Sequence, residues 1–271
     1  MNFVEISTFA SDEKYVKIPF YKDGKPVHES VFWGMTLRSA GSMRFRWNEE
    51  NPLRTKTLSE IACGREIAAV QLDHTKIVYK ADSADDVFQK IGDGIVTKNK
   101  NLMPVVTVAD CMPIYFYDSK SGFFGVVHSG WKGTGIAFEA LNIAQREFGA
   151  KIENICVALG PHIRNCCYVV NQERADYFRR NFTEDCVRPV SAGEILCKGT
   201  AALWNSGNGP LFRLSLEMAN LALLRKAGIC EKNIVVAKDC TCCNGIFGSN
   251  RRETSSGNSF TVQAAFVINN E

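Results

Sequence analysis

Short apolar runs recur along the 271-residue chain, and most of them are rich in β-branched and aromatic residues. Runs of this length are typical of strands, and a run without alternating polar positions indicates a strand that is buried on both faces. On this basis the sequence predicts strands at residues 66–72, 76–80, 103–109, 113–118, 123–128, 154–160, 233–238 and 261–268.

Apolar residues recur at helical spacing in three other segments. Helices are predicted at residues 134–150, 171–182 and 212–229, and Gly149 and Gly228 stand where the first and last of them are expected to end. Strands outnumber helices, and only some alternate with them, which favours a mixed layered sandwich of the α+β class over a doubly wound parallel sheet. Because no repeat and no Pro/Gly/Ser linker divides the chain, residues 1–271 are expected to form a single domain.

Composition and charge exclude several classes of protein. The formal net charge is +3 and no basic block stands out, so neither nucleic acid nor a membrane surface is expected as a partner. No apolar stretch approaches the ~20 residues that a bilayer span needs, and the first residues lack the features of a signal peptide. No Gly-x-Gly-x-x-Gly follows a predicted strand, and there is no P-loop lysine. The expectation is a cytoplasmic protein whose eleven cysteines are reduced.

A thiol and an imidazole lie at the ends of two neighbouring predicted strands. The strands are joined by a short polar connection, which is typical of a β-hairpin. If Asp118 pairs with Phe123, Pro113 lies opposite His128, and Cys111 then lies at the same open end of the hairpin. His74 also follows a predicted strand, so three potential metal ligands lie at strand ends.

Two imidazoles and one thiolate form a donor set that suits a tetrahedral divalent ion such as zinc. Three protein ligands leave a fourth position for water or substrate, as in catalytic sites. The same spacing leaves two other interpretations open: His128 activates Cys111 as a metal-free nucleophile, or these residues only pack or face solvent. Asp110 is a candidate for orienting a ligand histidine or for acting as a base.

Three further motifs are weaker evidence for a binding site. Arg251 and Arg252 are candidates for binding phosphate, with a solvated loop pair as the alternative. The glycine-rich segment 129–135 enters a predicted helix, where backbone N–H groups can hold an anion. Residues 240–243 read Cys-Thr-Cys-Cys, but no second Cys-x-x-Cys lies at zinc-finger distance, so no separate structural zinc is predicted.

Five motifs together resemble the YfiH family, which is also named for laccase-domain or multicopper polyphenol oxidase-like proteins. In chain order they are "VQLDHTKIV", "TVADCMPIYFYD", "VVHSGWKGT", "ALGPHIRNCCYVV" and "CTCCNGIFGSNRRE". The resemblance implies a single-domain α/β/β/α layered sandwich and one zinc ion bound by His74, Cys111 and His128. It also implies phosphorolysis of adenosine, inosine or methylthioadenosine to the base and ribose 1-phosphate, with adenosine deamination as a second activity. Phenol oxidation and the editing of peptidoglycan precursors have also been assigned to the family.

Positions around the expected metal site depart from the family pattern. Lys132 stands where the family commonly has arginine, which keeps the charge but loses the two-pronged guanidinium. Val169, Asn250 and Asn258 replace a glutamate, a tyrosine and a second arginine, whereas Arg38 is retained. These departures concern the substrate-binding periphery rather than the metal ligands.

The leading hypothesis is a zinc-dependent purine nucleoside enzyme that acts on a nucleoside and phosphate. His74, Cys111 and His128 would bind zinc, Cys111, His128 and Asp110 would form the catalytic centre, and Arg38, Lys132, Arg251 and Arg252 would offer positive charge to the substrate. Two alternatives are a copper-type phenol oxidase and a Cys111-dependent amidase. A non-catalytic protein with a structural zinc is a fourth hypothesis. The sequence does not indicate the oligomeric state.

Overall fold

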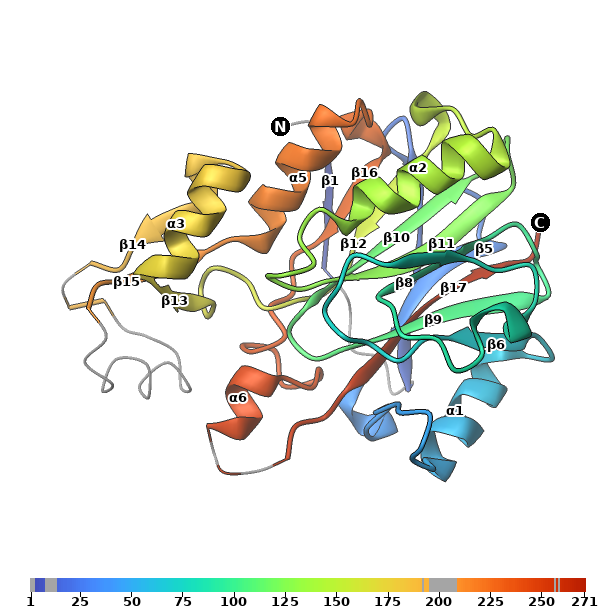
Figure 1. The fold of residues 1–271 in the computed structure, drawn as a ribbon, viewed down its shortest axis with the longest axis horizontal. Helices are drawn as coiled ribbons and strands as arrows, with labels where there is room; N and C mark the ends of the chain where they lie inside the picture. Colours follow the sequence, from blue (N-terminus) through green and yellow to red (C-terminus); the bar gives the residue numbers. More distant parts are fainter. Residues whose placement is uncertain (1–2, 8–13, 192, 195–208, 256, 258) are drawn as a thin grey trace.

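Two mixed sheets pack face to face, and helices cover their outer faces (Figure 1). The computed structural model describes residues 3–7, 14–191, 193–194, 209–255, 257 and 259–271. In spatial order, the seven-stranded sheet consists of β1 (Val4–Ile6), β16 (Ile234–Ala237), β12 (Cys156–Leu159), β10 (Met112–Asp118), β11 (Phe123–Ser129), β8 (Gly94–Thr97) and β7 (Val78–Lys80). The five-stranded sheet consists of β2 (Tyr15–Pro19), β5 (Val31–Thr36), β17 (Gln263–Asn269), β9 (Leu102–Val108) and β6 (Glu66–Ala69).

Side chains of the central strands alternate between two cores. On β10, Ile114 and Phe116 belong to the cluster shared with helices α2 (Ile136–Phe148) and α5 (Leu216–Lys226), whereas Tyr115 and Tyr117 belong to the cluster between the sheets. This alternation follows from the two-residue period of a strand. Both faces of the strand are buried, which explains why its sequence is a continuous apolar run.

The five-stranded sheet is buried on its other face as well. Phe266 of β17 packs in a cluster with Leu58 and Ile61 of helix α1 (Pro52–Ala62). The order of layers is therefore helix, sheet, sheet, helix, as the family resemblance implied. The α+β layered sandwich with mixed sheets is confirmed.

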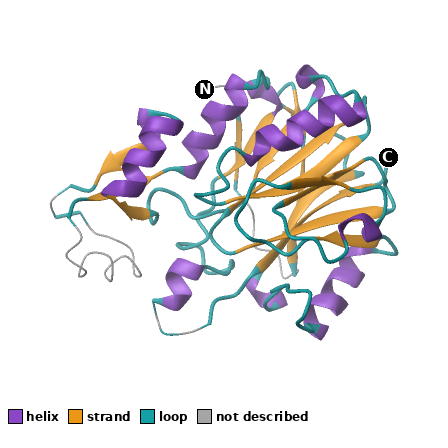
Figure 2. Ribbon diagram, viewed as in Figure 1, coloured by secondary structure: helices purple, strands orange, loops and turns teal. Residues whose placement is uncertain are grey.

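Shorter elements complete the described structure (Figure 2). A three-stranded sheet lies beside helix α3 (Gln172–Asn181), away from the two main sheets in Figure 1. Its strands are β13 (Val169–Asn171), β15 (Leu211–Leu214) and β14 (Val187–Pro189). The other elements are β3 (Tyr21–Lys22), β4 (Lys25–Pro26), α6 (Asn250–Thr254) and the 3-10 turns η1 (Arg38–Ala40), η2 (Ala84–Val87), η3 (Ile152–Asn154), η4 (Glu184–Cys186) and η5 (Glu231–Asn233).

The predicted hairpin has the expected register. Asp118 pairs with Phe123, and Pro113 pairs with His128. The prediction for residues 212–229 is wrong at its beginning, because residues up to Leu214 form β15 and the helix begins only after Ser215, whose hydroxyl accepts a hydrogen bond from the backbone of Met218.

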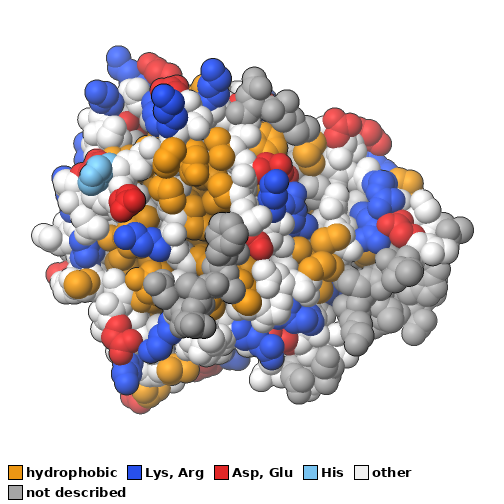
Figure 3. Space-filling view, turned by 180° about the vertical axis from the view of Figure 1, so that it is seen from behind, with side chains coloured by type: hydrophobic (Ala, Val, Ile, Leu, Met, Phe, Trp, Pro, Cys, Tyr) orange, Lys and Arg blue, Asp and Glu red, His pale blue; other side chains and the backbone are white. Residues whose placement is uncertain are grey.

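Charged side chains of both signs lie on the surface that faces away in Figure 1. Figure 3 shows lysine and arginine side chains interspersed with acidic ones on this face, around an apolar patch. In the described part of the chain, no helix has both the length and the apolar character that crossing a membrane requires.

Candidate metal centre and its pocket

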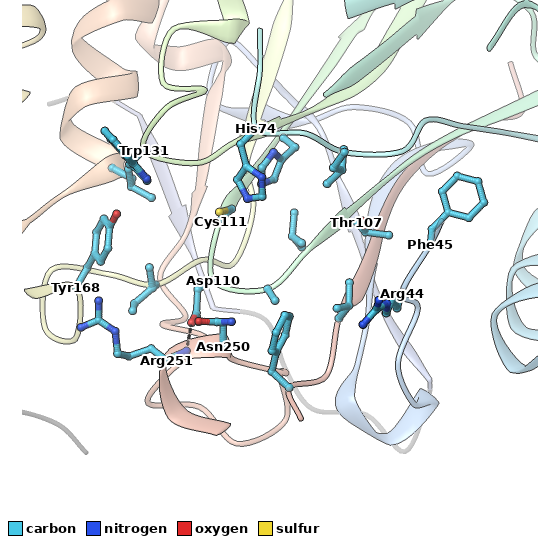
Figure 4. A pocket seen from close by; sticks show the side chains of 18 of the residues that line it. Arg44, Phe45, His74, Thr107, Asp110, Cys111, Trp131, Tyr168, Asn250 and Arg251 are labelled. Carbon is cyan, nitrogen blue, oxygen red and sulfur yellow. Dashed lines mark hydrogen bonds between the residues drawn. The ribbon is translucent and has the colours of Figure 1, made fainter. Parts of the chain in front are cut away.

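Three potential metal ligands converge at one end of the sandwich (Figure 4). His74 lies in the loop after β6, Cys111 in the turn between β9 and β10, and His128 near the end of β11. One ligand atom from each residue lies within 4.8 Å of the other two. The two imidazole rings are perpendicular, with centroids 5.0 Å apart. The hairpin register brings Cys111 and His128 together, and the loop after β6 adds His74.

A buried aspartate that the sequence analysis did not identify orients this group. Asp93 lies directly before β8 and accepts a hydrogen bond from Nδ1 of His128 at 2.8 Å, so Nε2 is the nitrogen left for a metal ion. Its carboxylate also accepts the backbone N–H of His74 at 3.1 Å and both the N–H and hydroxyl of Thr75 at 2.6 Å. Burial raises the pKa of Asp93, but the hydrogen bonds from His128 and Thr75 outweigh burial and lower it.

Gly130 leaves the space in which the three ligands meet. A Cβ atom at this position would lie 2.9 Å from Sγ of Cys111 and 3.6 Å from ring carbons of both His128 and His74. The first distance is shorter than a carbon–sulfur contact allows, so any larger residue would displace the thiol. The glycine in this segment therefore keeps room beside the ligands.

Cys111 and His128 influence each other's protonation. Burial raises the pKa of the Cys111 thiol, but the charge and hydrogen bond of His128, with a smaller contribution from His74, bring it from 9.0 down to about 7. Burial lowers the pKa of His128, but Cys111 and Asp93 outweigh this effect and raise it to about 10. A thiol that ionises near neutral pH beside two imidazoles is a suitable donor set for zinc.

The group opens into a pocket of about 460 Å³, a size typical of small-molecule sites. Aromatic and cationic side chains line the wall next to Cys111. The guanidinium of Arg174 lies 4.4 Å from the ring centroid of Trp131, and that of Arg251 lies 5.8 Å from the ring centroid of Tyr168. Nη1 of Arg174 is 3.4 Å from the hydroxyl of Tyr168. Arg44 and Phe45 lie on the opposite side of the pocket in Figure 4, and Arg46 also lines it.

Comparison with known proteins places this chain in a family. The model of the family described as "Multi-copper polyphenol oxidoreductase laccase" matches residues 49–265. The chain belongs to this laccase family. Together with solved YfiH-like and YlmD-like structures, this match confirms the family resemblance.

Curated relatives of the laccase-family chain carry names of purine nucleoside enzymes. It is 32% identical over 182 residues to "Purine nucleoside phosphorylase LACC1" of Mus musculus, covering 65% of this chain and 37% of the relative. It is 31% identical over 164 residues to "Purine nucleoside phosphorylase YlmD" of Geobacillus stearothermophilus, covering 59% and 55%. A prokaryotic relative named "Adenosine deaminase RL5" is 30% identical over 175 residues, covering 62% and 60%. The matches thus span about a third to three fifths of these relatives.

Two solved structures share the fold along nearly the whole chain. The crystal structure of YlmD from Geobacillus stearothermophilus has a TM-score of 0.78 at 23% identity and covers 97% of this chain and 99% of that one. The Bacillus licheniformis protein YfiH, titled hypothetical, has a TM-score of 0.73 at 25% identity, covering 88% and 92%.

Not all of the four cationic side chains that were predicted to bind substrate line the pocket. Only Arg251 is among the pocket-lining residues. Nη1 of Arg252 donates to the backbone carbonyls of residues 241, 242 and 244 at 2.6–3.3 Å, so this guanidinium holds its own loop together. Nε of Arg38 pairs with Glu253 at 3.3 Å, and Nζ of Lys132 lies 5.5 Å from the ring centroid of Trp131, outside the pocket lining.

Arg44, Arg46 and Arg174 are the pocket cations that the sequence analysis missed. Arg44 makes a two-pronged pair with Glu49 at 3.0 Å. Arg46 donates to the carbonyl of Leu72 at 3.2 Å. The only signal in the sequence for Arg174 is its place on a predicted helix, which says nothing about the distant pocket.

Asp110 has a different environment from the one expected. Its carboxylate accepts hydrogen bonds from the hydroxyls of Thr241 at 2.6 Å and Ser249 at 3.0 Å, and from the backbone N–H of Arg251 at 2.6 Å. Burial raises its pKa more than these hydrogen bonds lower it. Asp110 therefore ties the turn before Cys111 to the segment 241–251, and the hydrogen bond that orients His128 comes from Asp93 instead.

Proposed function

We propose that this protein is a zinc-dependent purine nucleoside enzyme that uses phosphate to release a free base and ribose 1-phosphate. The observation that carries the proposal is the open three-ligand group of His74, Cys111 and His128 on the floor of a pocket whose walls are aromatic and cationic. The names of the relatives, purine nucleoside phosphorylase in most cases, support this substrate class. Adenosine, inosine and methylthioadenosine are the proposed substrates.

The donor set fits zinc, and when bound the ion would act as a Lewis acid towards an oxygen of the reactants at its open position. Asp93 would keep His128 in the tautomer whose Nε2 lone pair faces the site.

The remaining roles belong to side chains of the pocket wall. Trp131 and Tyr168 present aromatic rings against which a purine can stack. Arg174 and Arg251 present guanidinium groups next to those rings, where the two-pronged geometry suits phosphate oxygens. A base on the rings and a phosphate on the arginines would bring both reactants of phosphorolysis into one pocket.

The test is an assay for both products. Purified zinc-loaded protein is incubated with inosine and phosphate, and hypoxanthine and ribose 1-phosphate are quantified by chromatography. Loss of activity in Arg174→Met and Arg251→Met, with retention in Arg146→Met, is the expected pattern, because Arg146 is exposed on α2 and pairs only with neighbouring Glu147 among the described ion pairs. If zinc-loaded protein releases neither product from inosine, adenosine or methylthioadenosine, the proposal is wrong.

Adenosine deamination is a second proposed activity of the same pocket, supported by the relative named adenosine deaminase. The assay for it is the formation of inosine from adenosine without phosphate. If inosine forms only in the presence of phosphate, or not at all, deamination is excluded as an independent activity.

A cysteine-dependent amidase is a further candidate because one observation favours it. The lowered pKa of Cys111 next to His128 is also what a nucleophilic thiolate requires. Amide hydrolysis that survives a chelator and is abolished by alkylation of Cys111 would favour this function over zinc. The family name favours copper, so metal analysis that finds copper at this centre would favour phenol oxidation instead.

A further inference from the structure

Four cysteines outside the pocket come together in space. Their sulfur atoms, from Cys166, Cys167, Cys240 and Cys243, all lie within 4.8 Å of one another. Two come from the turn that precedes β13 and two from the turn that follows β16, so the segments are up to 77 positions apart in the sequence. Residues 240 and 243 form the Cys-x-x-Cys pair whose partners the sequence did not reveal.

The sulfur separations are those of a single tetrahedral ion. Zinc–thiolate bonds of ~2.3 Å in a regular tetrahedron place neighbouring sulfur atoms ~3.8 Å apart. Sγ of Cys243 lies 3.7 Å from that of Cys166 and 3.2 Å from that of Cys167. A disulfide would need about 2.05 Å.

The backbone already holds the two turns in place. A β-bridge joins His162 to Cys240, and the N–H of Thr241 donates to the carbonyl of His162 at 3.0 Å. The N–H of Arg164 points at Sγ of Cys240 at 3.4 Å, a contact that stabilises a thiolate. The β-bridge and the hydrogen bond from Thr241 to His162 therefore bring the two turns together without involving the sulfur atoms.

Two guanidinium groups hold the turns that carry the four cysteines. The guanidinium of Arg213 donates to the carbonyl of Asn165 at 3.1 Å and to that of Cys166. On the other turn, Arg252 donates to the carbonyls of Thr241 and Cys242 at 2.6 and 3.0 Å. Both guanidinium groups also pair with carboxylates, Arg213 with Glu194 and Arg252 with Glu253, so their role at the cluster is to hold the two turns.

We propose that Cys166, Cys167, Cys240 and Cys243 bind a second zinc ion, separate from the centre at His74, Cys111 and His128. Four protein ligands leave no open position, so this ion is structural. Cys167 and Cys240 are buried, whereas Cys166 and Cys243 are exposed, so the ion lies at the edge of the core.

The second ion would fix one wall of the pocket. Tyr168 follows Cys167 directly, and Arg251 donates to the carbonyl of Val169 at 3.3 Å. Thr241, between the paired cysteines, donates to Asp110 at 2.6 Å. The cysteine cluster thus joins the two segments that carry Tyr168 and Arg251 to the pocket, and no disulfide joins them among the described residues.

The test is metal quantification by mass spectrometry on the full chain, purified under reducing conditions. Wild type is expected to hold two zinc ions per chain, Cys111→Ser and Cys240→Ser one each, and the double variant none. Cys230→Ser, which removes an exposed thiol outside both groups, is expected to keep two. One zinc ion in wild type with no change in Cys240→Ser overturns the proposal, as does iron in place of the second zinc.

A second measurement covers the case in which Cys240→Ser fails to fold. Cys111→Ser is loaded with Co²⁺, and the visible spectrum of a tetrahedral cobalt tetrathiolate is expected. Absence of that spectrum, or an intact mass two hydrogens short under non-reducing conditions, which indicates a disulfide, contradicts the proposal. Neither readout involves nucleoside turnover, so the result is independent of the proposed function.

Discussion

Replacing Asp93 with asparagine keeps the size of the side chain but removes one of two acceptor oxygens. One oxygen of Asp93 accepts from Nδ1 of His128 and the N–H of His74, and the other accepts from the N–H and hydroxyl of Thr75. An amide cannot serve both sets of donors. If its NH2 faces His128, the imidazole must present an acceptor at Nδ1 and carry its proton on Nε2, which removes the lone pair that a metal ion needs.

If the amide turns the other way, its NH2 faces the backbone N–H of Thr75. That part-buried donor then has no protein acceptor, at a cost of about 1 kcal/mol of folding free energy. Changing a residue that orients a ligand histidine typically weakens metal binding by 10–100-fold. At about 1.4 kcal/mol per tenfold, the expected loss in zinc-binding free energy for Asp93→Asn is about 1.4–2.8 kcal/mol.

The measurement is a competition titration with a zinc chelator. The chelator removes and returns only the zinc ion at the His74–Cys111–His128 centre. Asp118→Asn is the matched control, because Asp118 is equally buried and also accepts backbone and hydroxyl donors, from Lys120 and Ser121. Asp118 lies at the turn of the β10–β11 hairpin, at the end away from Cys111 and His128. The control is expected to lower thermal stability without changing zinc affinity. Wild-type zinc affinity in Asp93→Asn, or an equal loss in both variants, would refute the reasoning.

Three other outcomes are expected. Gly130→Ala should weaken zinc binding at least tenfold, because its Cβ would lie 2.9 Å from Sγ of Cys111. Gly245→Ala should leave zinc binding unchanged, because no atom lies within 4 Å of the added Cβ. Chelator competition measures both variants, and equal effects would contradict the steric argument. In metal-free protein, the rate of Cys111 alkylation should rise with pH through a midpoint of about 7, because the thiolate forms there beside His128. Mass spectrometry of the labelled peptide measures this rate, and a midpoint near pH 9 would contradict the prediction. Burial lowers the pKa of His162 from 6.5 to about 4, so between these pH values only the unfolded chain binds a proton at this residue. The free energy of unfolding should therefore fall by about 3 kcal/mol as the pH drops from about 6.5 to about 4. Urea titrations should show this loss in wild type and a smaller one in His162→Gln, and identical pH profiles would disprove it.

Local sequence patterns predicted the part of the site that depends on one hairpin. The four-residue connection between β10 and β11 sets the register, and the register alone places Pro113 opposite His128 and Cys111 at the same end. The layered fold was predictable for a similar reason, because each central strand is buried on both faces and shows it as an apolar run. The single domain over residues 1–271 stays a prediction.

Residues that reach the site from other elements gave no comparable signal. Asp93 precedes a short buried strand, and nothing in its sequence neighbours shows that His128 will lie beside it. Arg252 and Arg251 are adjacent, yet one binds carbonyls of its own loop and the other faces the pocket. The direction of each side chain is set by the backbone of segment 241–251, which Asp110 holds through three hydrogen bonds across the fold.

The backbone at the metal centre indicates that the ligand positions are imposed by the fold. His74 and Asp110 have φ angles of 55° and 75°, a left-handed conformation that costs a residue with a side chain about 1–3 kcal/mol. Both angles are held by hydrogen bonds: the N–H of His74 to Asp93, and the carboxylate of Asp110 to Thr241, Ser249 and Arg251. One strained residue is a proposed zinc ligand and the other directly precedes Cys111. Because strain of this kind persists only where the surroundings over-determine it, the loops after β6 and β9 are held so that a histidine and a thiol point at one place, and a substitution that releases either loop should weaken zinc binding.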